Sequence, residues 1–158
     1  FSNAGKCVPD TPELLDHHIP AGIGTDCAAH GGLSLWNEMK IFRSVMNLHH
    51  GVQKHIPNIM PSKRIFDMTI SNGAQILNEE GTLGKIQAGY KADLIGIDIN
   101  QPHLYPSGNW QNTLLESVNA NDVTEMIIGG KFIMRNREVL TLDQERIMYE
   151  ARKWNDSL

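Results

Sequence analysis

Asp26 stands where a carboxylate could do chemistry. It closes the stretch "AGIGTD" (residues 21–26), in which a short apolar run passes through Gly24 and Thr25, and a loop of small residues follows. In parallel α/β architectures, catalytic groups lie at the carboxyl ends of strands. A carboxylate at such a point can ligate a metal, accept a proton from water, or do both. The residues alone also allow a second interpretation, in which Asp26 only caps the following turn.

The other candidate groups are weaker. His30 lies four residues after Asp26 and either lines a pocket or is a solvated loop histidine. Cys7 and Cys27 fit neither a zinc motif nor a disulfide framework, and Cys27 is expected to be a buried thiol rather than a nucleophile. Three further histidines could suggest a metal site but have neither H-x-H nor H-x-x-x-H spacing: His49, His50 and His55.

The elements around Asp26 read as an αβ unit. Thr11 is expected to cap a short helix with Pro12 in its first turn, and a strand is expected over residues 20–25. Ser34 is expected to cap a second helix that ends near "HHG" (residues 49–51). One apolar stripe follows the helical period along this second helix: Leu35, Met39, Phe42 and Met46.

The rest of the chain changes character. Residues 61–80 predict a helical segment interrupted at "SNG", with Ile65 and Met68 on one face and a stripe that continues at Ile70, Ala74 and Leu77. Residues 81–100 predict short strands with turns at Gly84 and Gly89. The runs on either side of Gly129-Gly130 predict a hairpin, with Asp93 in a turn or at the sheet edge. The apolar face of this hairpin is expected to include Ile127, Ile128 and Phe132. Thr141 and Gln144 predict a capping box for a closing helix whose stripe is Ile147, Ala151 and Trp154.

Composition narrows the class of protein. The chain has 158 residues, of which 41% are hydrophobic, and a net charge of −4, which suits a globular domain with a real core. The sequence lacks the cluster of basic residues that a nucleic-acid-binding face would need. No apolar run approaches the length of a membrane span, about 20 residues. No signal peptide is visible. Two free thiols favour the cytoplasm.

Five stretches, in order, resemble one family of enzymes. They are "FSNAGKC", "IPAGIGTD", "LWNEMK", "SNGAQIL" with "GTLGKIQAGYKADLIGID", and "NDVTEMIIGGKFIMRNREVLTLD". Together they resemble the C-terminal part of a metal-dependent amidohydrolase. Within that superfamily the sequence is most similar to the branch that holds methylthioadenosine/S-adenosylhomocysteine deaminases, s-triazine hydrolases and guanine deaminases.

The resemblance implies a fold and a metal ligand. It implies the last part of a (β/α)8 TIM-like barrel, plus the C-terminal strands of a small composite β-sandwich. Asp26 would be a metal ligand and the catalytic acid–base group, while the family's ligand histidines would lie upstream of Phe1. The metal would be one divalent ion, zinc or iron. Ser2, Asn3 and His30 would lie near the substrate.

The expected function is hydrolysis of a C–N bond, by deamination or dechlorination, on a purine-, pterin- or triazine-like ring. The alternative is a non-catalytic scaffold or assembly segment with the amidohydrolase fold. The chain is expected to be a fragment, with the remainder of the same enzyme as its partner in a homo-oligomer. Alone it is expected to be inactive, poor in metal and prone to associate. The expected parts are a barrel segment (residues 1–80), a sandwich portion (81–140) and a terminal helix (141–158).

Overall fold

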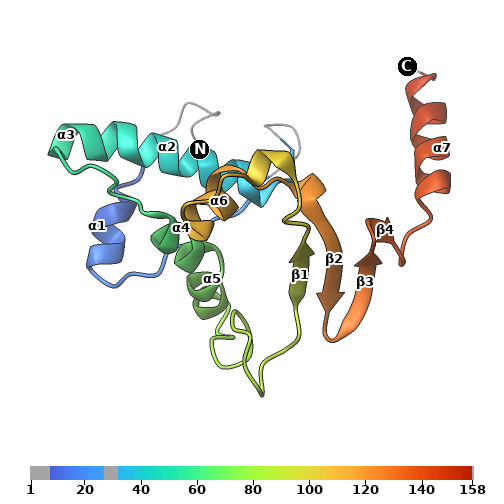
Figure 1. Cartoon of the computed structure of the whole chain (residues 1–158), viewed down its shortest axis with the longest axis horizontal. Helices are drawn as coiled ribbons and strands as arrows, with labels where there is room; N and C mark the ends of the chain where they lie inside the picture. The colour runs from blue at the N-terminus through green and yellow to red at the C-terminus, as the bar shows by residue number, and fades with distance from the viewer. Residues whose placement is uncertain (1–7, 27–31, 158) are drawn as a thin grey trace. The chain divides into compact units, whose positions relative to one another are not determined.

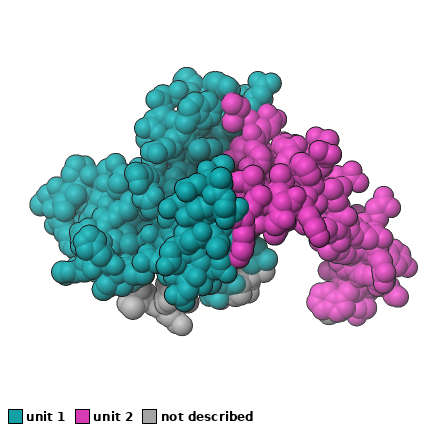
Figure 2. All heavy atoms as spheres, turned by 90° about the horizontal axis from the view of Figure 1, so that it is seen from below, with its two compact units in different colours: residues 1–90, 100–120 teal, residues 91–99, 121–158 magenta. Residues whose placement is uncertain are grey.

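A computed structural model describes residues 8–26 and 32–157 of the chain. The chain divides into two compact units, and each is described by itself (Figure 2). Unit 1 comprises residues 1–90 and 100–120, and unit 2 comprises residues 91–99 and 121–158.

Unit 1 is helical (Figure 1). Its helices and helical turns are α1 (Thr11–Asp16), α2 (Leu35–Met46), the π-helical turn η2 (Asn47–Gly51), α3 (Val52–Lys54), α4 (Ser62–Thr69), α5 (Ser71–Ile76), the 3₁₀ turn η3 (Pro102–Leu104) and α6 (Trp110–Glu116).

The two predicted N-terminal helices are both present. Ser34 caps α2 as expected, because its hydroxyl accepts a hydrogen bond from the Asn37 N–H at 3.4 Å. The predicted cap of α1 is wrong by one residue. Asp10, not Thr11, accepts from the Glu13 N–H at 3.3 Å, so Thr11 becomes the first helical residue and is buried.

The second helix does not end near "HHG", as its sequence predicts. After Met46 the chain makes the π-helical turn η2 and continues through α3. The helix ends at His55, whose φ of 53° is left-handed. The continuation keeps His50 buried against the segment before α1, a tertiary contact that the local pattern does not reveal.

A methionine-rich core holds unit 1 together. Of the predicted α2 stripe, Met39 and Met46 are buried and Phe42 packs against them, whereas Leu35 is exposed. The buried members of this core are Met39, Met46, Ile59, Met60, Ile65, Met68 and Leu115. They come from α2, α4, α6 and the segment before α4, so burying them joins parts of the chain that are far apart in sequence.

Three polar side chains of α2 reach α6 and the residues that follow it. The Trp36 indole Nε1–H donates to the Leu114 carbonyl at 2.8 Å, and the Lys40 ammonium donates to the Val118 carbonyl at 3.0 Å. Arg43 forms an ion pair with Glu116. The last carbonyls of a helix have no partner within it, so the Trp36 bond supplies one for Leu114 in the last turn of α6.

The broken helix predicted over residues 61–80 is present, with its break displaced. Pro61 precedes α4, and Ile65 and Met68 share its buried face as expected. The break falls at Ile70, and "SNG" begins α5 instead of interrupting the helix. Ala74 of α5 is buried, whereas Leu77, the next member of the predicted stripe, is exposed.

Unit 2 is built on an antiparallel sheet of four strands in the order β1-β2-β3-β4 (Figure 1). Its elements are β1 (Leu94–Ile97), β2 (Val123–Ile128), β3 (Lys131–Arg135), β4 (Glu138–Val139) and helix α7 (Gln144–Asn155). A 3₁₀ turn, η4 (Ala120–Asp122), precedes β2 and begins at the last residue of unit 1.

The predicted hairpin is confirmed. Gly129 and Gly130 have φ values of 55° and 78°, the left-handed pair that a two-residue turn of this kind requires. Ile127 pairs with Phe132 across the hairpin, whereas the adjacent Ile128 is more exposed and pairs with Lys131. Because neighbouring residues of a strand point to opposite faces, Ile127 and Ile128 do not share one apolar face.

The stretch before β2 is partly as predicted. Gly84 and Gly89 have φ values of 82° and 91°, as expected for tight turns. Several short strands are expected within residues 81–100, all of which the structure describes. The structure has one strand there, β1, so this prediction is only partly correct. Asp93 lies at a turn beside the sheet, where its carboxylate accepts from the Gly129 N–H at 2.6 Å.

Helix α7 is present, but its predicted capping box is wrong. Asp143 caps it by accepting from the Arg146 N–H at 2.9 Å. Its predicted apolar stripe is exposed, with Ile147 at 50% and Trp154 at 66%. Across residues 8–26 and 32–157, none of the helices combines the length and apolarity that crossing a membrane requires.

The hairpin turn gives the first testable prediction. Replacing both Gly129 and Gly130 with valine should lower the unfolding midpoint, because each β-branched residue would be held at positive φ at a cost of about 1–3 kcal/mol. The matched control is Gly108→Val, at an exposed glycine without positive φ and with no atom within 4 Å of an added Cβ. Thermal unfolding of the full-length protein measures both. An equal midpoint for the two variants would contradict the turn assignment.

Candidate active site

The segment that leads to Asp26 is not a strand in the described structure, contrary to the prediction for residues 20–25. A strand is defined by pairing, and no neighbouring strand pairs with this segment in the part of the chain that the structure describes. Its burial nevertheless alternates: residues 21, 23 and 25 are half-buried and residues 22, 24 and 26 are exposed. That period of two is typical of an extended chain with one face against a core.

Two kinds of contact hold this segment against unit 1. The side chains of Ala21 and Ile23 pack against the methionine-rich core. The Asn72 side-chain amide of α5 donates to the Ala21 carbonyl at 3.2 Å, and the Ile19 N–H donates to the Leu14 carbonyl at 2.9 Å. The segment is therefore positioned by both side-chain packing and backbone hydrogen bonds.

Asp26 ends this segment with an exposed side chain and an unusual backbone. Its φ of 57° is left-handed, a conformation that aspartate tolerates better than most residues. Two residues earlier, an added Cβ on Gly24 would meet no atom within 4 Å, so the chain before the carboxylate is open on that side. Among the described residues, the Asp26 carboxylate has no hydrogen bond or ion pair. An exposed carboxylate without a partner can accept a proton or ligate a cation.

The other predicted site residues lie outside the described residues: Ser2, Asn3 and His30, together with Cys7 and Cys27. Within residues 8–26 and 32–157, no group of three or more His, Cys, Asp or Glu side chains is placed to hold a metal ion. The described part of the chain therefore offers Asp26 as a single candidate ligand, and the grouping of Asp26 with Ser2, Asn3 and His30 stays a prediction.

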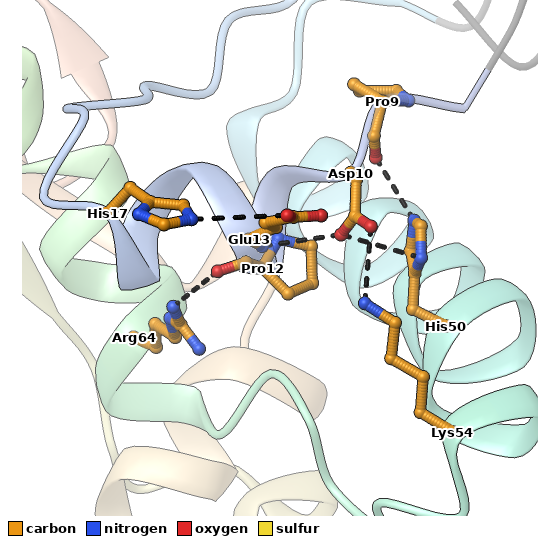
Figure 3. A network of polar contacts seen from close by, with 8 residues as sticks. All are labelled: Pro9, Asp10, Pro12, Glu13, His17, His50, Lys54 and Arg64. Atoms are coloured by element: carbon orange, nitrogen blue, oxygen red, sulfur yellow. Dashed lines mark hydrogen bonds and ion pairs between the residues drawn. The ribbon is translucent and has the colours of Figure 1, made fainter.

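A second polar cluster joins α1 to the end of the α2–α3 helical run (Figure 3). His50 is only 7% exposed, with Nε2 at 3.2 Å from the Pro9 carbonyl and Nδ1 at 3.6 Å from the Asp10 carboxylate. The Lys54 ammonium donates to the other Asp10 oxygen at 3.2 Å. The helical spacing of His50 and Lys54 could have revealed this cluster, but the sequence predicted that the helix ends before Lys54.

The cluster lowers the pKa of Asp10. Desolvation acts in the opposite direction and raises it, but hydrogen bonds from Lys54 and the Glu13 N–H, with the charges of His50 and Lys54, outweigh that effect. Asp10 therefore favours its ionised form in the folded protein. This is a structural role, since Asp10 caps α1 and ties it to α3.

Comparison with known proteins decides the family. Residues 2–133, most of the chain, match the model of the amidohydrolase family. The chain belongs to the amidohydrolase family. The match includes Asp26 and the segment around it, and it extends through β2 into β3, so the resemblance carried by the sequence motifs is confirmed at family level.

Relatives of this amidohydrolase-family chain include nucleoside deaminases. The 5-methylthioadenosine/S-adenosylhomocysteine deaminase of Dictyoglomus thermophilum is 40% identical over 147 residues, which are 92% of this chain and 33% of the relative. The 5'-deoxyadenosine deaminase of Methanosarcina mazei is 32% identical over 147 residues, again 92% of this chain and 33% of the relative. The chain thus spans about a third of the length of these relatives.

Solved structures share the fold. An adenosine deaminase from Xanthomonas campestris with bound zinc superposes with a TM-score of 0.81 at 22% identity, over 92% of this chain and 33% of that one. A zinc complex of atrazine chlorohydrolase from Arthrobacter aurescens gives a TM-score of 0.79 at 19% identity, over 94% of this chain and 32% of that one. The chain therefore has part of the amidohydrolase fold, with mixed helices and strands and a small antiparallel sheet.

The lowered pKa of Asp10 gives a prediction about acid stability. A carboxyl group whose pKa is lowered on folding stabilises the protein above its unfolded pKa, and that contribution is lost as the pH falls through the folded value. The difference in unfolding midpoint between the wild type and Asp10→Asn should therefore shrink as the pH falls below 3.8, the ordinary pKa of the group. Thermal unfolding between about pH 7 and pH 3 measures it.

Lys54→Gln supplies the control for this experiment. Because the Lys54 hydrogen bond is the first of the effects that lower the pKa of Asp10, the pH-dependent part of the difference should be smaller in a Lys54→Gln background. A difference between wild type and Asp10→Asn that stays constant with pH would contradict the assignment.

Proposed function

We propose that this chain is the C-terminal part of a metal-dependent amidohydrolase that deaminates the purine ring of an adenosine-like nucleoside. The observation that carries the proposal is Asp26, an exposed carboxylate at the end of a core-anchored segment in a chain of the amidohydrolase family. The substrate class follows the relatives that are 32–40% identical and are named as deaminases of such nucleosides. In this proposal the segment before Asp26 is the eighth strand of a (β/α)8 barrel, and unit 2 contributes to a small β-sandwich.

The residues present fit one part of a metal site. The Asp26 carboxylate is exposed and, within the described residues, has no protein partner that a metal would have to displace. Zinc usually takes three or four ligands from protein side chains, so one carboxylate needs ligands from outside the described residues. In this proposal they are histidines of the remaining part of the same enzyme. Zinc is favoured over iron because two solved structures of the same fold contain zinc.

Asp26 would act twice in the reaction. A bound divalent metal supplies the acidity that makes hydroxide available at neutral pH. The Asp26 carboxylate would help to hold the metal, take up the proton that the water releases, and deliver it to the leaving amine. A C–O bond forms at the ring carbon, the C–N bond to the amino group breaks, and the group leaves as ammonia. Ser2, Asn3 and His30 are proposed to line the substrate pocket.

The setting of the enzyme is part of the same proposal. Its substrate is a small molecule, its partner is the remaining part of the same polypeptide, and it works as a homo-oligomer in the cytoplasm. The parts proposed for this chain are a barrel segment (residues 1–80), a sandwich portion (81–140) and a terminal helix (141–158). The two cysteines of the sequence, whose spacing fits no disulfide framework, support a reducing compartment.

The role of Asp26 predicts the effect of one substitution in the complete enzyme. Asp26→Asn should lower kcat by about 10²- to 10⁴-fold, because an amide cannot take up the proton of the attacking water. Bound metal, measured by elemental analysis, should also fall. The matched control is Asp67→Asn, which removes a carboxylate whose partner, Lys63, lies one helical turn away on α4. Turnover of Asp26→Asn near that of the control would rule out the role.

The substrate class predicts which compounds are turned over. The zinc-loaded complete enzyme should release ammonia from adenosine, 5'-deoxyadenosine or 5'-methylthioadenosine. Treatment with a chelator should abolish this activity, and added zinc should restore it. Guanine and a chlorinated triazine are the comparison substrates. Release of chloride from the triazine without ammonia from any nucleoside would replace deamination by dechlorination, and no turnover with a full complement of metal would favour a non-catalytic scaffold.

A further inference from the structure

The backbone that leads to Asp26 needs partners, because buried or half-buried carbonyl and N–H groups are costly when unpaired. Residues 21, 23 and 25 are half-buried, yet no strand pairs with this segment among the residues that the structure describes. The Ala21 carbonyl obtains its partner from a side chain. The Asn72 amide nitrogen donates to it at 3.2 Å across 51 positions of sequence.

Asn72 reaches Ala21 from a helix that lies directly against the segment. An added Cβ on Gly22 would be 3.2 Å from Cδ1 of Ile76 and 3.7 Å from the Met68 carbonyl oxygen. A Cβ at position 22 would therefore crowd the Ile76 side chain of α5 and would lie in van der Waals contact with the end of α4. The glycine permits the approach that brings the Ala21 carbonyl within reach of Asn72.

The helix that carries Asn72 is itself anchored. Ala74 is buried, and an added Cβ on Gly84 would lie 3.3 Å from the Ile70 carbonyl and 3.5 Å from Cβ of Ala74. The turn at Gly84 thus packs closely on the junction between α4 and α5. A donor on an anchored helix holds its acceptor in one place, whereas a donor on a loose loop would follow its acceptor.

We propose that Asn72 is a positioning residue for Asp26, acting by fixing the Ala21 carbonyl of the segment that carries the aspartate. The inference rests on the proposed function, in which Asp26 ligates the metal and moves the proton. Ala21 and Ile23 pack on the core through side chains, which resist movement into the core but allow sliding along it. A directional hydrogen bond from Asn72 opposes that sliding, and misplacement of a reacting group by about 1 Å can cost about 10²-fold in rate.

The test uses the complete enzyme and four substitutions. Asn72→Leu removes the amide with little change in volume, and Asn72→Asp keeps the shape but loses the N–H donor. Asn72→Gln keeps an amide donor on a longer side chain. Gln75→Met is the matched control, because Gln75 is an exposed amide on the same helix, and its side chain makes no hydrogen bond within the described residues.

Two measurements separate a positioning role from a purely structural one. Hydrogen exchange followed by mass spectrometry should show faster exchange in the peptide that spans residues 19–26 for Asn72→Leu and Asn72→Asp, with other peptides unchanged. The same variants should lose about 10- to 100-fold in kcat with KM within about twofold, as expected when support for a metal ligand is removed. Asn72→Gln should lie between these variants and the wild type, and Gln75→Met should match the wild type.

Three results would overturn the proposal. The first is exchange in residues 19–26 that is the same in Asn72→Leu, Asn72→Asp and Gln75→Met. The second is a loss of protection that is uniform across the protein with a lower unfolding midpoint, which would make Asn72 a general stability residue. The third is faster exchange with unchanged kcat. If the wild type deaminates no nucleoside, the proposed function fails, and the exchange of residues 19–26 still decides whether Asn72 fixes the segment.

Discussion

Burial of the methionine-rich core is the interaction on which the rest of unit 1 depends. Met39 and Met46 bring α2 onto α4 and α6, and each large apolar side chain that leaves water contributes about 1.5–3 kcal/mol. Methionine is unbranched and adapts to irregular gaps, which suits a core assembled from short helices that meet at different angles. The hydrogen bonds from Trp36 and Lys40 to carbonyls near the end of α6 then fix the position of α6 along α2.

This core also determines where Asp26 can be. Ala21 and Ile23 lean on it, so the alternating residues of the same segment, including Asp26, are exposed. The packing of Ala21 and Ile23 links the carboxylate to the core, which supports the catalytic role proposed for Asp26.

Sequence patterns predicted caps and turns correctly where residues a few positions apart determine the structure. Ser34 caps its helix, and Gly129-Gly130 makes a hairpin turn, because both depend on residues within a few positions. Predictions failed where a distant contact or a competing neighbour decides. The run through "HHG" stays helical with His50 buried against Pro9, and the caps moved to Asp10 and Asp143 because each of these neighbours also carries a carboxylate that can accept the bond.

The strand expected before Asp26 also shows that a local pattern cannot predict a contact with a distant segment. Its apolar run and its period-two burial are properties of the segment, but pairing is a property of two segments, and residues 8–26 and 32–157 supply no partner strand for it. Asn72 supplies one of the missing backbone partners from a side chain instead. No periodicity could have predicted that bond, because it joins a half-buried carbonyl to an amide at the start of a helix that the sequence pattern had broken at the wrong residue. The sequence could therefore single out Asp26, whereas what holds its segment becomes visible only once α5 is in place.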